Sequence, residues 1–196
     1  ASMPIGDLDG AALEACLQRS APRPTRAAVS AVGDPAVERR VCRALEALGL
    51  DVCCNPDPGI ELRIDHPETC GRDRLYAALG AVEGVPEADD PDGLVVIDAG
   101  TAVTVDAVSL TPLAFLGGAI APGPGTLAAS LSRAGARLPE FAVRPDVNAL
   151  GRSTEEALRA GVVVGFRGAV RDLCTTIAAE AFGPTASVAG VLTGGA

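Results

Sequence analysis

The chain has 196 residues, of which 48% are hydrophobic and 21% are charged, a composition typical of a folded globular protein rather than a disordered one. Its formal net charge of -9 would repel the phosphates of nucleic acids and of anionic membranes, so we expect neither as a partner. Asp98 and Asp106 interrupt the longest apolar stretches, and no segment is therefore predicted to span a membrane.

Helical and strand patterns alternate in the first half of the chain. Pro35 in a first turn and Gly49 just past a last turn delimit one predicted helix, and Asp9 is a candidate N-cap of an earlier one. An acidic, proline-rich segment at residues 85–93 predicts a hinge or a domain boundary. The predicted elements are helix 11–18, strand 26–32, helix 35–48, strand 50–54, strand 61–64 and helix 72–79.

The second half begins with an apolar run typical of a strand buried on both faces. Three glycines within a long helical pattern would cost stability unless a close helix contact uses them, namely Gly161, Gly165 and Gly168. The predicted elements are strands 94–99, 101–108 and 114–120, helix 126–133, a loop over 137–150, helix 153–180 and strand 188–192.

The cysteines and the single histidine argue against a zinc site, because no CxxC pair occurs and His66 is the only histidine. His66 precedes Pro67 in a predicted loop, and no G-x-S-x-G segment accompanies it, so we expect a surface residue rather than a triad member. Residues 1–10 have no basic-then-apolar signal pattern, and we expect a cytoplasmic protein. Its cysteines are then predicted to be six buried, reduced thiols: Cys16, Cys42, Cys53, Cys54, Cys70 and Cys174.

The segment Asp98 to Thr101 (DAGT) follows a buried strand and precedes another strand. Its backbone N–H groups and the Thr101 hydroxyl could face phosphate oxygens, while Asp98 faces a cation. Rossmann and Walker loops are excluded, since their glycine loops open a helix. Taken alone, these four residues favour the alternative of an ordinary hairpin turn, for which DAGT is suitable chemistry.

Two further segments lie at predicted helix starts. In Gly71 to Arg74 (GRDR), the helix dipole would stabilise Asp73 as a carboxylate, and Arg74 could bind an anion. The alternative is a capping aspartate with solvated arginines. Ser153 with Glu156 three residues later predicts a capping box, which is a complete structural explanation.

A glycine-rich segment, residues 117–125 (GGAIAPGPG), surrounds a predicted strand end. Four glycines there let the backbone approach something closely, either a ligand or another strand.

These motifs, in this order and spacing, resemble the type III pantothenate kinase family. Residues 67–74 (PETCGRDR) are similar to the family's P-x-E-V-G-A-D-R segment, and residues 96–106 (VIDAGTAVTVD) match its second phosphate motif. Further matches are residues 117–123 (GGAIAPG), 136–139 (ARLP) and 151–161 (GRSTEEALRAG). The likeness runs from Arg26 to the C-terminus.

The resemblance implies an α/β protein with the two-lobed actin-like (ribonuclease H-like) fold, in which mixed sheets are flanked by helices. The N-terminal lobe would be residues 1–90 and the C-terminal lobe residues 91–196. The implied reaction moves the γ-phosphate of ATP to the primary alcohol of pantothenate, the first step of coenzyme A biosynthesis, with Mg²⁺ and a monovalent cation (K⁺ or NH₄⁺). A homodimer is expected, with the long helix near the interface.

Site residues are carried over from the family only at matching positions. Asp73 would be the general base and Asp98 the ligand of the monovalent cation, while Gly100 and Thr101 would bind ATP. The residues expected to hold pantothenate are Gly71, Arg72, Asp73, Arg74 and Thr154.

The family opens with a strand and a D-x-G-N-T loop that holds the ATP phosphates, and nothing similar precedes Asp7 to Gly10. The N-terminal lobe is therefore expected to be incomplete. The alternatives are a non-catalytic homologue that acts as a binding or regulatory accessory protein, and another actin-like kinase or phosphatase with a different small substrate.

Overall fold

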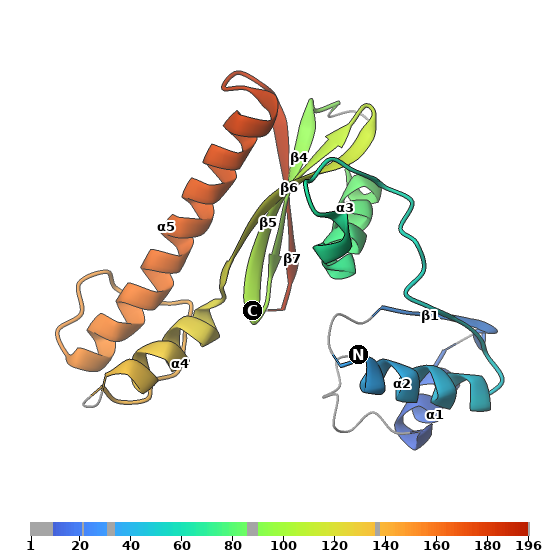
Figure 1. Cartoon of the computed structure of the whole chain (residues 1–196). Coiled ribbons are helices and arrows are strands. Elements are labelled where there is room, and N and C mark those ends of the chain that lie inside the picture. Colours follow the sequence, from blue (N-terminus) through green and yellow to red (C-terminus); the bar gives the residue numbers. More distant parts are fainter. Residues whose placement is uncertain (1–9, 21, 31–33, 86–89, 136–137, 196) are drawn as a thin grey trace. The chain divides into compact units, whose positions relative to one another are not determined.

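The protein is described by a computed structural model that covers residues 10–20, 22–30, 34–85, 90–135 and 138–195. Its contacts divide the chain into two compact units, and each has a sheet of its own (Figure 1). The first unit comprises Ala1–Gly59 and Cys70–Asp73, and the second comprises Ile60–Thr69 and Arg74–Ala196. The lobe boundary predicted near residue 90 stays a prediction.

The first unit is built around a strand–helix–strand arrangement. Strands β1 (Arg26–Val29) and β2 (Asp51–Cys54) are parallel neighbours, and α2 (Pro35–Ala47) connects them. The Asp34 carboxylate accepts a hydrogen bond from the backbone N–H of Ala36 at 2.8 Å, which caps the start of α2. Gly49 has a φ of +84° just past its end. Helix α1 (Gly10–Gln18) precedes these elements.

The cysteines differ from the prediction of six buried thiols, which is wrong. Cys42, buried on α2, forms a disulfide with Cys54 at the end of β2. Cys16 and Cys53 are exposed, and Cys70 and Cys174 are half-buried. The pairing depends on β2 folding back beside α2, which brings together two residues twelve positions apart.

The second unit contains a mixed five-stranded sheet in the order β3-β6-β5-β4-β7. Strands β4 (Gly93–Ala99), β5 (Ala102–Leu110) and β6 (Leu113–Pro122) form an antiparallel meander. Strand β3 (Glu61–Leu62) pairs in parallel with β6, and β7 (Val188–Gly194) pairs in parallel with β4. The predicted mixed α/β architecture is confirmed.

Helices cover the two faces of this sheet (Figure 1). The long helix α5 (Thr154–Phe182) packs on one face, where Val95, Val103 and Val105 form a buried cluster with apolar side chains of α5. Helix α3 (Arg72–Gly84), which follows a short 3₁₀ turn at Pro67–Thr69, lies on the other face. Helix α4 (Pro124–Ala134) follows β6 directly. Because strand side chains alternate, Asp98 and Asp106 belong to the face opposite α5.

Each helix and strand predicted from the sequence has a counterpart among the described residues, and α3 extends beyond its predicted end to Gly84. No described helix is long and apolar enough to cross a membrane. The Asp9 cap, residues 31–32 of the first predicted strand, residues 86–89 of the predicted hinge and residues 136–137 of the ARLP segment lie outside the described residues.

Two leucines on adjacent strands of the sheet test where the core lies. Leu94 on β4 is fully buried, whereas Leu192 on β7 is 74% exposed. Leu94→Ala should lower the free energy of unfolding by roughly 2–5 kcal/mol, because it removes buried methyl groups and leaves a cavity. Leu192→Ala, the matched control, should lower it by less than about 1 kcal/mol. Urea denaturation measures both, and equal losses would contradict this assignment of the core.

Candidate active site

The segment Asp98 to Thr101 forms the hairpin turn between β4 and β5. The Gly100 N–H donates to the carbonyl of Ala102 at 2.9 Å, and Ala99 pairs with Val103 where the strands resume. Because a strand rather than a helix follows the glycine, the exclusion of helix-opening phosphate loops is confirmed. The Asp98 side chain is half-buried at the end of its strand, and Thr101 is exposed at the turn.

Three side chains that carry oxygen form a row across the sheet beside this turn. Asp98 on β4 lies directly opposite Thr104 on β5 and Thr193 on β7. Directly opposed residues project from the same face of a sheet. A carboxylate and two hydroxyls are hard oxygen donors of the kind that bind alkali and alkaline-earth cations.

The last strand approaches this row closely because it ends in glycine. Gly194 has a φ of +101°, and a Cβ there would lie 2.2 Å from the carbonyl oxygen of Ala99. The next N–H, of Gly195, donates to that same oxygen at 3.0 Å. Sequence reasoning did not assign Thr193 or Gly194 to the site, although a TGG segment after an apolar strand was the available signal.

The glycine-rich segment brings β6 and α4 against the Asp98–Thr101 turn. A Cβ at Gly123 would lie 2.0 Å from the carbonyl oxygen of Gly100. The Gly123 N–H donates to the Thr101 carbonyl at 2.9 Å, and the Thr126 hydroxyl donates to the same carbonyl at 2.6 Å. The sequence left two explanations for this glycine, close approach to a ligand or to another strand. The structure shows close approach to another backbone segment, the β4–β5 turn.

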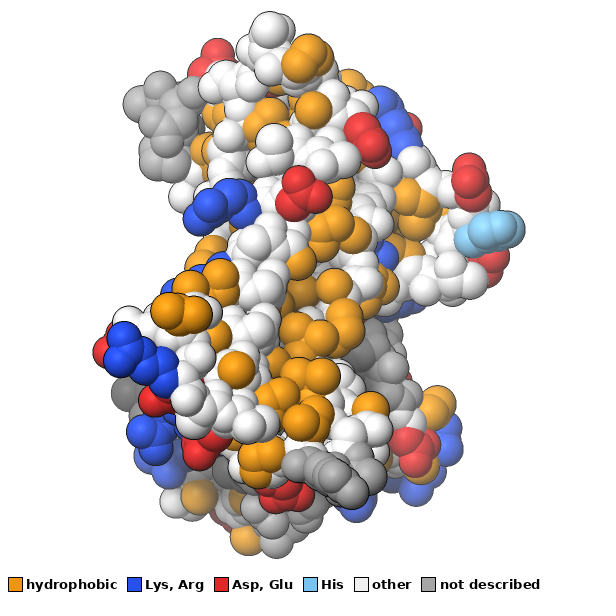
Figure 2. Space-filling view, turned by 90° about the vertical axis from the view of Figure 1, so that its left-hand side faces the viewer, with side chains coloured by type: hydrophobic (Ala, Val, Ile, Leu, Met, Phe, Trp, Pro, Cys, Tyr) orange, Lys and Arg blue, Asp and Glu red, His pale blue; other side chains and the backbone are white. Residues whose placement is uncertain are grey.

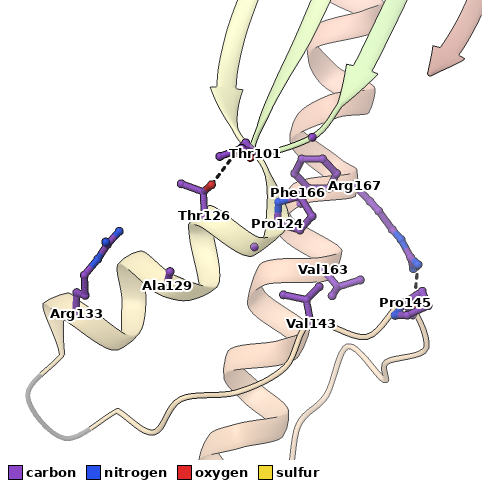
Figure 3. Close-up of a pocket in the computed structure, with 12 residues that line it drawn as sticks. Thr101, Pro124, Thr126, Ala129, Arg133, Val143, Pro145, Val163, Phe166 and Arg167 are labelled. Atoms are coloured by element: carbon purple, nitrogen blue, oxygen red, sulfur yellow. Dashed lines mark hydrogen bonds between the residues drawn. The ribbon is translucent and has the colours of Figure 1, made fainter. Parts of the chain in front are cut away.

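A pocket of about 900 Å³ opens beside the turn, between α4 and α5 (Figure 3). Its walls are mostly apolar, and an arginine from each helix adds positive charge. Arg167 donates to the carbonyl of Pro145 at 2.7 Å, which fixes its side chain along one wall. The lining residues that bear on ligand binding are Gly100, Thr101, Thr126, Arg133, Phe166 and Arg167.

The start of α3 carries two exposed charged side chains. Arg72 donates to the backbone carbonyls of Asn55 and Pro56, at 3.0 Å to the latter. Asp73 is exposed in the first helical turn, and a Cβ at Gly71 would lie 2.4 Å from its Oδ1. The glycine thus leaves room for the carboxylate that was predicted to be the general base.

The next residue, Arg74, lies against the sheet. Its Nε donates to both carboxylate oxygens of Asp106, at 3.1 and 3.2 Å, and its Nη2 donates to Oδ1. The guanidinium also lies over the Phe115 ring, with 5.2 Å between its central carbon and the ring centroid. Asp106 was not predicted to be a site residue, since a single carboxylate inside a strand motif gave no sign of its partner.

The start of α5 holds the last predicted substrate residue. The Ser153 hydroxyl accepts from the Glu156 N–H at 3.2 Å, and the Glu156 carboxylate accepts from the Arg152 N–H at 2.7 Å. The predicted Ser153 cap is confirmed, whereas Glu156 accepts from the residue before the cap rather than from the cap itself. Thr154 is exposed in the first turn and does not line the pocket beside Thr101.

Shifts of pKa in the second unit also occur away from the predicted site residues. A hydrogen bond from Arg63 lowers the pKa of Glu61, and both side chains are exposed. Burial raises the pKa of the Cys174 thiol, which packs against the valine cluster beneath α5. His66 is exposed beside Glu68, as predicted for a surface residue.

A family model for type III pantothenate kinase matches residues 6–176. The chain belongs to the type III pantothenate kinase family. A relative with that name from Thermus thermophilus is 41% identical over 162 residues, which cover 81% of this chain and 62% of the relative. A type III pantothenate kinase of Rhodospirillum centenum is 40% identical over 136 residues, which cover 65% of this chain and 49% of the relative. The chain thus spans less than two thirds of the length of these relatives.

A solved structure from Campylobacter jejuni, described as a putative transcriptional activator of the Baf family, matches with a TM-score of 0.52. The match covers 91% of this chain and 80% of that chain at 20% sequence identity. At this identity the likeness concerns the fold alone.

Two neighbouring glycines test how the turn at Gly100 and Thr101 is held. Gly123→Ala should lower the free energy of unfolding by roughly 1–3 kcal/mol, because the new methyl group overlaps the Gly100 carbonyl. Gly125→Ala in the first turn of α4 meets nothing within 4 Å and should be neutral or stabilising. Thermal and urea denaturation of both variants make the comparison, and a neutral Gly123→Ala would contradict the close packing.

Proposed function

We propose that this chain carries out ATP-dependent phosphorylation of pantothenate to 4′-phosphopantothenate, as part of an enzyme with the two-lobed actin-like fold. The supporting observation is the family match, which spans both the Gly71–Arg74 segment and the Asp98–Thr101 turn. The residues around the turn suit the proposal, since the Thr101 hydroxyl and two nearby arginines can receive an anionic nucleotide.

Asp73 is proposed to accept the proton of the pantothenate hydroxyl. Phosphoryl transfer of this kind depends mainly on positioning and on neutralising charge, so the base needs only to reach the hydroxyl late in a loose transition state. An exposed carboxylate in the first turn of α3 meets this requirement. Gly71, Arg72, Arg74 and Thr154 are proposed to hold pantothenate.

The nucleotide and its cations are proposed to lie at the β4–β5 turn. Gly100 and Thr101 would contact ATP at the mouth of the pocket between α4 and α5. The row of Asp98, Thr104 and Thr193 offers the oxygen donors that a K⁺ or NH₄⁺ ion requires. Mg²⁺ would neutralise the ATP phosphates when bound.

A cytoplasmic homodimer is part of the same proposal. Figure 2 views the side of the chain that carries α4 and α5, where hydrophobic side chains gather. A Cβ added at each of the three glycines of α5 would meet no atom of another described segment within 4 Å, so no close packing among the described residues requires glycine there. A second copy packed along α5 would give them the close helix contact that their cost in stability requires.

The general base is tested with Asp73→Asn. The variant should lose roughly 10²–10⁴-fold in kcat, because an amide cannot accept the hydroxyl proton. Pantothenate binding, measured by calorimetry, should weaken far less. A coupled ADP assay with pantothenate, Mg²⁺ and K⁺ measures turnover, both on this chain and on a version preceded by a D-x-G-N-T strand and loop.

Asp172→Asn, an exposed substitution on α5, is the matched control and should leave kcat within about twofold. Pantothenate binding without turnover in either version would support the non-catalytic accessory role instead. Phosphorylation of another small alcohol in a substrate panel, with none of pantothenate, would indicate a different actin-like kinase.

A further inference from the structure

Asp106 is a carboxylate enclosed by the sheet. It is 1% exposed and lies in the middle of β5, opposite Val96 on β4 and Gly118 on β6. A charge buried among apolar strands is strongly disfavoured unless a partner compensates for it. Arg74 is that partner, and its own side chain is only 15% exposed.

Residues of the neighbouring strand β6 make space for the Asp106 carboxylate and contact the Arg74 guanidinium. A Cβ at Gly118 would lie 2.5 Å from Oδ1 of Asp106 and 2.1 Å from the Val105 carbonyl oxygen, so only glycine leaves space for the carboxylate. Gly117 has a φ of +103°, and the β5–β6 register shifts beside it. The fully buried Phe115 places its ring under the Arg74 guanidinium.

This geometry fixes the orientation of Arg74 rather than only neutralising its charge. Contacts from Nε to both carboxylate oxygens constrain the plane of the guanidinium, and the aromatic ring constrains it from one face. Buried ion pairs are often no more stabilising than well-packed apolar residues of the same volume. Fold stability alone therefore does not account for a charged pair at this position.

We propose that Asp106 is a positioning residue that acts through Arg74 and holds the first turn of α3 in its working geometry. Arg74 directly follows Asp73 in the same helical turn, so a fixed Arg74 restricts the backbone that carries the base. The proposal rests on the proposed phosphorylation of pantothenate for its catalytic consequence. Its structural consequence, an ordered first turn of α3, is independent of that function.

Asp106→Asn keeps the size of the side chain and removes the charge. In the version of the chain that turns over pantothenate, kcat/KM for pantothenate should fall roughly 10- to 100-fold, because small displacements of positioning groups are costly. The KM for ATP should stay within about twofold. A lysine at position 74 cannot make the contacts of Nε to both oxygens. In an Arg74→Lys background, Asp106→Asn should therefore lower kcat/KM for pantothenate by less than a further factor of about two.

Glu61→Gln, which breaks the exposed pair with Arg63, is the matched control and should leave all these constants within about twofold. Full additivity of Asp106→Asn and Arg74→Lys would overturn the proposal, because Asp106 would then not act through Arg74. An unchanged kcat/KM in Asp106→Asn would overturn it as well.

Hydrogen exchange followed by NMR, without any ligand, separates this proposal from the proposed function. In an α-helix the amides of Tyr76, Ala77 and Ala78 bond to the carbonyls of the first turn. Asp106→Asn should speed their exchange by roughly tenfold or more and leave the Val95 and Val105 amides unchanged. Unchanged exchange in α3, or equal acceleration throughout the sheet, would overturn the positioning role even if the chain phosphorylates pantothenate. Faster exchange confined to α3, in a chain without turnover, would uphold the positioning and refute only the kinase.

Discussion

A carboxylate buried inside a β-sheet constrains much of the second unit. Asp106 requires a cation beside it and space in front of it, and these come from Arg74 on α3 and Gly118 on β6. The requirement joins a helix and two strands that are distant in sequence. It also gives Gly118 in the middle of β6 a physical reason, since any side chain there would occupy the position of the carboxylate.

The opposite requirement, close approach of backbone to backbone, shapes the end of the sheet where the phosphate site is proposed. Gly123 and Gly194 each bring a neighbouring segment within contact of the β4–β5 turn or the strand before it. The β4–β5 turn has the backbone hydrogen bonds of an ordinary hairpin, and its distinctive feature is the set of groups around it. Side-chain oxygens on three adjacent strands point from one face, and a pocket with two arginines opens beside Thr101.

The elements of this fold could be predicted from the sequence because they follow from local signals. The Pro35 start and Gly49 end of α2, and the apolar runs of β4 and β5, depend on residues close together in the chain. Register and pairing could not be predicted in the same way. The Cys42–Cys54 disulfide and the Arg74–Asp106 pair depend on which segments become neighbours in the fold. The identity of a single residue does not predict its partner in another segment.

The candidate site shows the same division. The sequence motifs led to Asp73, Asp98 and Thr101 through their resemblance to a family, and their chemical roles stay predictions. The sequence did not predict Thr193 and Asp106 as supporting residues, because their relation to the site follows from cross-strand pairing. A motif thus indicates where a ligand is expected, whereas the fold decides which neighbours hold the motif in place.

The most direct test of this account is hydrogen–deuterium exchange of the chain with and without pantothenate, resolved to short peptides. We predict that pantothenate protects the peptide containing Gly71 to Arg74 and leaves the exposed Glu61–Arg63 segment unchanged. Protection at the start of α3 would locate the substrate beside the proposed base before any turnover is measured. No protection there at saturating pantothenate would contradict the assignment of this helix turn to substrate binding.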